Sequence, residues 1–208
     1  MRLKDFFYKI YRKMSSVLIN TFYEVKVEGR ENIPEDKGFI LVANHASFLD
    51  PLAIGVAITP KQLRWMILKS YYDLWFLRWF YWGAQCFPAE RGRKGLRAIR
   101  RALDLVREGK IIGIFPEGRR SEDGKLGEGK RGVALVALKI GAPILPVAII
   151  GSYEAYSRHR IFPKVGITIT VRIGKLIQPD EFPEEEGKKA LQEFTNMIMD
   201  SIRKLQKA

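Results

Sequence analysis

Residues 39–51, with the sequence FILVANHASFLDP, contain the pattern that decides the expected fold. Five consecutive apolar residues, Phe39–Ala43, predict a buried β-strand. Asp50 and Pro51 then predict the start of a helix, with aspartate as the N-cap and proline at the first helical position. A buried strand followed closely by a helix is typical of an α/β layered domain.

The same alternation continues along the chain, whose 208 residues are enough for one domain and an appendage. We predict a single α/β domain over residues 25–208, in which helices flank a mostly parallel central sheet. A joint near Tyr23–Val27 separates this domain from an N-terminal amphipathic helix, residues 1–24. Further strands are expected at 63–68, 84–87, 111–115, 144–150 and 166–173, and helices at 51–58, 71–82, 95–108, 132–140 and 184–206.

The composition is that of a folded, strongly basic protein. Apolar residues make up 47% of the chain, and 36 lysines and arginines against 23 aspartates and glutamates give a net charge of +13. This charge predicts an anionic partner, which can be nucleic acid, an anionic membrane or an acidic substrate. A single cysteine, Cys86, excludes an internal disulfide framework. With only His45 and His159 as histidines, we expect no metal site.

The N-terminal helix combines an apolar side with cations. The apolar residues at helical spacing are Leu3, Phe6, Phe7, Ile10, Met14, Val17 and Leu18, and the cations are Arg2, Lys4, Lys9, Arg12 and Lys13. This pattern suits the headgroup region of an anionic bilayer, and the alternative is a surface helix packed on the domain. Trp75, Trp79 and Trp82 lie in a second aromatic stretch, which predicts either a further interfacial contact or a buried core helix. We expect no membrane-spanning segment.

His45 and Asp50 follow the first buried strand and form the first candidate for chemistry. A histidine at the carboxyl end of a strand lies where open α/β sheets place their ligands. A carboxylate five residues later can hydrogen-bond one imidazole nitrogen and leave the other free to accept a proton. The alternative is structural, with Asp50 as a helix cap and His45 as a packed side chain. Spacing alone leaves both readings open.

Two further charged loops follow expected strands. Residues 115–121 (FPEGRRS) place a glutamate beside a glycine and two arginines, which offers an acceptor for hydroxyl groups and donors for phosphate. Residues 87–91 (FPAER) end in an arginine that could face a phosphate. The alternative for both is a solvated turn. Residues 124–130 fit the spacing of a nucleotide-binding P-loop, but Arg131 stands where serine or threonine would bind magnesium.

Together these motifs resemble those of the glycerolipid acyltransferases of the 1-acylglycerol-3-phosphate acyltransferase (PlsC-like) family. Asn44, His45 and Asp50 match its NHxxxxD motif, and residues 115–121 match its FPEGTRS motif. Residues 86–91 resemble its IFIDR-like segment, and residues 145–147 (LPV) resemble its proline-containing strand, so the likeness spans about residues 25–180.

Three departures from the family pattern concern the segments associated with acceptor binding. Arg119 stands in place of threonine, Glu90 in place of aspartate, and Pro88-Ala89 where an apolar residue and isoleucine are usual. The resemblance therefore implies the reaction class and leaves the acceptor headgroup open.

The resemblance implies an enzyme of phospholipid biosynthesis with the α/β fold of this family. It would move a fatty acyl group from an acyl thioester to the sn-2 hydroxyl of 1-acyl-glycerol 3-phosphate (lysophosphatidic acid) and form phosphatidic acid. By resemblance His45 is the general base, Asp50 orients it, and no covalent enzyme intermediate forms. The implied substrate-binding residues are Arg91, Glu117, Gly118, Arg119, Arg120, Ser121 and Lys130. The implied donor is acyl carrier protein or acyl-CoA, with no cofactor.

Location and rival functions follow from the same features. A lipid acceptor and a basic chain imply a peripheral protein on the cytoplasmic face of the cell membrane, bound to its anionic surface. One alternative is the same chemistry on glycerol 3-phosphate or another lysophospholipid. Alternatives of a different class are a nucleic-acid-binding module, for which the sequence has no helix-turn-helix, RNP, KH or zinc signature, and a non-catalytic membrane-binding protein. We expect no nucleic-acid partner.

Overall fold

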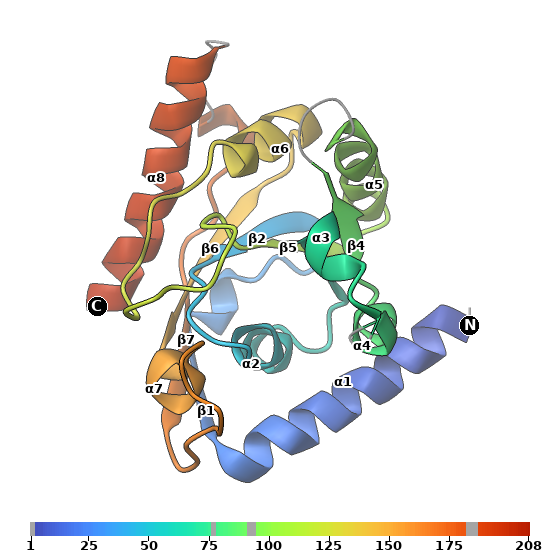
Figure 1. The fold of residues 1–208 in the computed structure, drawn as a ribbon. Helices are drawn as coiled ribbons and strands as arrows, with labels where there is room; N and C mark the ends of the chain where they lie inside the picture. The colour runs from blue at the N-terminus through green and yellow to red at the C-terminus, as the bar shows by residue number, and fades with distance from the viewer. Residues whose placement is uncertain (1–2, 76–77, 91–94, 182–186) are drawn as a thin grey trace.

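A computed structural model describes residues 3–75, 78–90, 95–181 and 187–208. Within these residues, one seven-stranded sheet is flanked by helices on both faces (Figure 1). The strands are β1 (Glu24–Glu28), β2 (Phe39–Ala43), β3 (Leu63–Leu68), β4 (Phe87–Ala89), β5 (Ile111–Ile114), β6 (Ile144–Ile150) and β7 (Thr168–Ile173). The helices are α1 (Leu3–Phe22), α2 (Asp50–Ala57), α3 (Lys69–Tyr72), α4 (Arg78–Gly83), α5 (Leu96–Arg107), α6 (Gly132–Ile140), α7 (Ser152–Tyr156) and α8 (Lys188–Lys207), with 3₁₀ turns at Arg30–Asn32 and Pro179–Glu181.

The sheet confirms the predicted fold class. Its strand order is β1-β7-β6-β2-β5-β3-β4, and neighbouring strands are parallel except for β6 and β7, which are antiparallel. Strand β2 lies inside the sheet, between β6 and β5. Residues that follow β2 therefore emerge at the carboxyl edge of the parallel strands, where such sheets bind ligands.

The apolar run of β2 is buried on both faces of the sheet because alternate side chains point to opposite sides. Phe39 and Leu41 belong to the core under α1 and α2, whereas Ile40 and Val42 belong to the core under α5, α6 and α8. Figure 1 shows the same arrangement, with α1 and α2 on one side of the sheet and α5, α6 and α8 on the other. This double burial keeps the start of the following loop in a fixed position.

The structure corrects several expected elements. The helix expected at residues 71–82 is interrupted: α3 ends at Tyr72 and α4 begins at Arg78. Aromatic residues fall on every side of an unbroken helix there, so a single helix could not bury them on one face. The strand expected at 84–87 begins only at Phe87, because Ala84 and Gln85 form a turn in which Gln85 has φ 51°.

Two elements, β1 and α7, are not predicted by the sequence, and one predicted helix begins outside the described residues. Strand β1 (Glu24–Glu28) lies at the edge of the sheet, where a joint near Tyr23–Val27 is expected from the sequence, and α7 follows β6. The C-terminal helix expected at 184–206 is present as α8 from Lys188, and residues 182–186 do not belong to the described residues.

Helix α1 packs on the domain with one side and exposes apolar residues on the other. Tyr8 and Ile19 are buried, with 5% and 1% of their surface exposed. The exposed apolar residues are Phe6, Phe7, Ile10, Met14, Val17, Leu18 and Phe22. In the aromatic stretch, Trp75 and Trp82 are exposed, which contradicts a buried core helix at these two positions. Among the described residues, no helix combines the length and apolar character that crossing a bilayer requires.

Candidate active site

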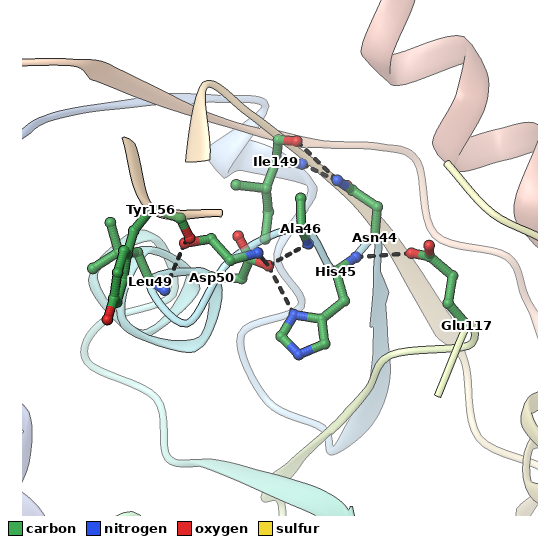
Figure 2. Close-up of polar contacts among 9 residues, drawn as sticks. Asn44, His45, Ala46, Leu49, Asp50, Glu117, Ile149 and Tyr156 are labelled. Atoms are coloured by element: carbon green, nitrogen blue, oxygen red, sulfur yellow. Dashed lines mark hydrogen bonds and ion pairs between the residues drawn. The ribbon is translucent and has the colours of Figure 1, made fainter. Parts of the chain in front are cut away.

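Asn44 determines how the chain leaves β2. Its Nδ2 donates to the carbonyl of Ile149 at 2.9 Å, and its Oδ1 accepts from the N–H of Ile149 at 2.8 Å (Figure 2). The side-chain amide thus takes the place of a backbone peptide in the pairing with β6. The backbone of the next residue is then free to turn out of the sheet while staying attached to it.

The Asp50 carboxylate organises this turn. Its Oδ2 accepts hydrogen bonds from the backbone N–H groups of Ala46 and Ser47, both at 2.7 Å, and lies 2.8 Å from Nδ1 of His45 (Figure 2). Because Oδ2 acts as an acceptor in all three contacts, Nδ1 is the protonated nitrogen of His45. The Asp50 side chain is fully buried, and Leu49, not Asp50, is the N-cap of α2. The structure therefore shows the histidine–carboxylate pair instead of the simple helix cap.

The His45 ring is held by stacking as well as by Asp50. It lies face to face with Phe115, with ring centroids 3.9 Å apart and planes 10° from parallel, and Trp65 stacks on the other face of Phe115 at 4.4 Å. About 18% of the His45 side chain is exposed, and its Nε2 has no hydrogen-bond partner among the described residues. This nitrogen can accept a proton from a bound ligand.

Glu117 ties the second loop to the first. Its Oε1 accepts from the backbone N–H of His45 at 2.8 Å, and its Oε2 accepts from the N–H of Gly127 at 3.1 Å. Burial raises the pKa of the Glu117 carboxyl, and the two N–H donors partly oppose that rise. A third link is the hydrogen bond from the Ser121 N–H to the carbonyl of His45, at 2.7 Å. The two predicted constellations therefore form one site.

Arginines gather on the open side of this loop. The Arg120 guanidinium lies 3.5 Å from the centre of the Phe48 ring, and its Nη1 is buried without a hydrogen-bond partner among the described residues. Burial and, second, the nearby charge of Arg158 lower the pKa of Arg120. Arg119 and Arg158 both contact the Glu122 carboxylate, at 3.3 Å and 3.2 Å. Three guanidinium groups with one carboxylate leave an excess of positive charge that suits a phosphate.

The remaining predicted residues occupy different positions around the loop. Gly118 has φ 68°, a conformation that favours glycine, and a Cβ built there would lie 2.8 Å from Nζ of Lys130. The Ser121 hydroxyl bonds to the Lys125 carbonyl and to Asp123, so this side chain secures the loop. Arg91 lies outside the described residues.

Sequence reasoning missed the aromatic stack and Arg158. Phe115 lay at the start of a recognised motif, but its stacking partner Trp65 comes from another strand. Arg158 lies in the basic stretch 158–160 (RHR), and only the fold brings it to Glu122. Among the described residues, no group of three or more His, Cys, Asp or Glu side chains is placed to hold a metal ion.

Known proteins share this arrangement of sequence and fold. A model of the acyltransferase family matches residues 24–150. A 1-acyl-sn-glycerol-3-phosphate acyltransferase of Bacillus subtilis is 30% identical over 200 residues, which cover 96% of each chain. A chloroplastic protein of the same name from Arabidopsis thaliana is 30% identical over 155 residues, 72% of this chain but only 42% of the plant protein. The crystal structure of the LPA acyltransferase PlsC from Thermotoga maritima matches with a TM-score of 0.74 and 25% identity, over 98% of this chain and 81% of that one.

Proposed function

The chain belongs to the acyltransferase family, and from this premise we propose that it transfers a fatty acyl group from an acyl thioester to the sn-2 hydroxyl of 1-acyl-glycerol 3-phosphate. The product is phosphatidic acid. The observation that carries the proposal is the His45–Asp50 pair, because Nε2 of His45 is open to a ligand. The loop that is hydrogen-bonded to the His45 backbone also carries Arg120, whose buried Nη1 has no hydrogen-bond partner among the described residues. The names of the relatives in Bacillus subtilis and Thermotoga maritima support this acceptor.

The chemistry needs one base and no covalent enzyme intermediate. His45 Nε2 removes the proton of the acceptor hydroxyl while its oxygen attacks the thioester carbonyl carbon. The tetrahedral intermediate collapses, the carbon–sulfur bond breaks, and the leaving thiolate takes the proton from the imidazolium. The Asp50 carboxylate stabilises the imidazolium formed in between, and the Phe115 ring keeps the imidazole in its plane.

The acceptor phosphate belongs at the arginine cluster of Arg119, Arg120 and Arg158 in this proposal. The buried Nη1 of Arg120 gains a partner when phosphate binds, which offsets its desolvation. Glu117 has both oxygens engaged by backbone N–H groups, so it supports the loop that carries Arg119 and Arg120. Glycerol 3-phosphate fits the same cluster and is the alternative acceptor.

The direct test is acyl transfer by wild type and His45→Ala in detergent or vesicles, with 1-acyl-glycerol 3-phosphate and glycerol 3-phosphate offered in competition. We expect wild type to form phosphatidic acid and the variant to be ~10²–10⁴-fold slower, with an unchanged circular dichroism spectrum. Turnover of glycerol 3-phosphate alone would move the assignment to the alternative acceptor. No transfer to either acceptor by folded wild type would refute the proposal.

A membrane location is part of this proposal because the acceptor and product are lipids. The exposed side of α1 carries Phe6, Ile10, Met14, Val17 and Leu18, whereas its inner side packs on the domain. Apolar residues next to cations on such a helix suit an anionic bilayer surface.

Vesicle co-sedimentation tests this location. We expect wild type to bind vesicles that contain phosphatidylglycerol, and the Met14→Ser/Val17→Ser/Leu18→Ser variant to lose most of that binding. Met197→Ser, on the exposed surface of α8, is the control and should bind like wild type. Equal binding of all three proteins would exclude α1 as the contact.

A further inference from the structure

Helix α5 presents a row of arginines to solvent that the proposed reaction does not use. Arg97, Arg100, Arg101 and Arg107 are all exposed, and Asp104 is the exposed acidic residue between them. The opposite side of the helix is fixed to the sheet through Ala98, Ala102 and Leu105. Within the described part of the chain, none of these four arginines forms a salt bridge, whereas Arg119, Arg158, Arg172 and Arg203 do.

This arginine face is unlike a membrane-binding helix. Of the large apolar side chains of α5, all within the described residues, only Leu96 at its first position is exposed. Helix α5 also lies on the opposite face of the sheet from α1, whose exposed side carries the apolar residues (Figure 1). When α1 lies on a bilayer, the face of α5 is directed away from it. The charge of α5 is therefore available to a partner in solution.

The dimensions favour a protein partner over a small anion. Arg97 and Arg107 are separated by roughly 15 Å along the helix, which a single diphosphate does not span. A row of this length can instead pair with acidic residues along one face of a helix in a protein partner. The face also lies close to the chemistry, because the chain enters α5 after β4, at the same edge of the parallel strands as His45. Strand β4 is three positions from β2, or roughly 14 Å across the sheet.

We propose that the arginine face of α5 is the docking surface for an acidic acyl carrier protein that delivers the acyl thioester to His45. This inference rests on the proposed acyl transfer. The carrier's flexible phosphopantetheine arm can cover the distance from the end of α5 to His45, while the acidic surface of the carrier binds the arginines. Charge complementarity of this kind steers the encounter and sets its salt dependence.

The test uses two donors and one pair of charge reversals. Steady-state kinetics are measured with palmitoyl-acyl carrier protein and with palmitoyl-CoA, for wild type and for Arg100→Glu/Arg101→Glu. We expect KM for the carrier-bound donor to rise at least about tenfold in the variant, and kcat/KM for palmitoyl-CoA to stay within about twofold of wild type. Lys204→Glu/Lys207→Glu on α8 changes the net charge equally and should leave both donors unaffected.

A binding measurement separates this inference from the proposed function. Palmitoyl-acyl carrier protein is titrated calorimetrically into the inactive His45→Ala protein, with and without the Arg100→Glu/Arg101→Glu pair, so that binding is seen even without turnover. Binding that is weakened by the reversal and by added salt supports the docking surface. The docking surface is excluded if the Arg100→Glu/Arg101→Glu pair leaves carrier binding unchanged, if wild type accepts the acyl group from palmitoyl-CoA alone, or if the pair lowers activity equally with both donors. It is also excluded if the pair abolishes vesicle or DNA binding while the carrier still binds.

Discussion

Asp50 performs two tasks with one buried oxygen. Its Oδ2 holds the backbone of Ala46 and Ser47 in a tight turn and at the same time fixes the tautomer of His45. Its Oδ1 is buried without a hydrogen-bond partner among the described residues. A single isosteric substitution can therefore remove the charge of Asp50 while keeping the shape of its side chain.

Asp50→Asn keeps an oxygen at the Oδ2 position but removes the charge that, in the proposed mechanism, stabilises the imidazolium. We expect kcat to fall by ~10²–10⁴-fold. The new amide NH₂ occupies the partnerless Oδ1 position, so the free energy of unfolding should fall by only about 1–3 kcal/mol. Kinetics and urea denaturation measure the two effects. The exposed Asp200→Asn on α8 is the control, and a variant with wild-type kcat would remove Asp50 from the mechanism.

Glu117 links stability to pH because burial raises its pKa above the ordinary 4.5. The folded state then holds this proton more tightly than the unfolded state does. The contribution of Glu117 to stability is greatest below the unfolded pKa and decreases as pH rises through the folded pKa.

Glu117→Gln removes this titration and leaves one of two backbone N–H groups facing an amide NH₂. We expect the variant to be about 1–3 kcal/mol less stable than wild type at low pH. The difference should shrink as pH rises, because only wild type loses stability through this group. Urea denaturation of both proteins from about pH 4 to about pH 7 gives the result. A difference that grows with pH would mean that the N–H donors outweigh burial.

At the scale of single elements, β5 shows how a strand residue supports the site indirectly. Gly113 lies opposite Leu41 of β2 and Trp65 of β3, and a Cβ built on it would meet the Trp65 ring at 2.5 Å. Because Gly113 has no side chain, the indole ring of Trp65 can lie against the backbone of β5. From there Trp65 supports Phe115, which in turn supports His45.

Gly113→Ala should therefore displace Trp65 and disturb the stack beneath His45. We expect a loss of about 1–3 kcal/mol in stability from overpacking, a changed near-ultraviolet circular dichroism signal and a lower kcat. Gly55→Ala on α2 is a matched control, because its Cβ would meet nothing within 4 Å. That control should raise stability by about 0.5–1 kcal/mol. An unchanged near-ultraviolet signal in Gly113→Ala would contradict the expected displacement of Trp65.

The elements that sequence predicted well are those with local causes. The apolar runs of β2 and β6 are continuous, and His45 and Asp50 are close enough in the chain to meet through one turn. Strand β1 is harder to predict, and the sequence indicates only a joint near Tyr23–Val27. In β1 exposed residues alternate with partly buried ones, and the strand joins the sheet only by pairing with the distant β7. Arg158 was missed for the same reason, since its nearness to Glu122 depends on the whole fold.

At the scale of the whole molecule, Cys86 reports on global unfolding. It is buried in the core under α1 and α2, and burial raises the pKa of its thiol from 9.0 to about 12. At neutral pH this leaves about a thousandfold less thiolate than an ordinary cysteine would have.

We therefore expect a thiol reagent such as Ellman's reagent to label Cys86 no faster than the protein unfolds. Labelling in native buffer is compared with the unfolding rate from urea jumps extrapolated to water, and the denatured protein serves as the reactive control. Labelling that clearly exceeds the unfolding rate would reveal a local opening of the region around α4 and β4.

The pairing of β1 with β7 has a consequence for synthesis on the ribosome. The paired residues Glu24 and Thr168 are 144 positions apart, so the first strand leaves the exit tunnel long before its partner exists. During that interval the edge position of β1 cannot form, and α1 has no completed sheet to pack against. The apolar side chains of α1 are then exposed on both sides of a nascent helix, when a bilayer or a chaperone can capture them. The order of translation therefore gives α1 an interval in which it can meet such a surface before the fold is complete.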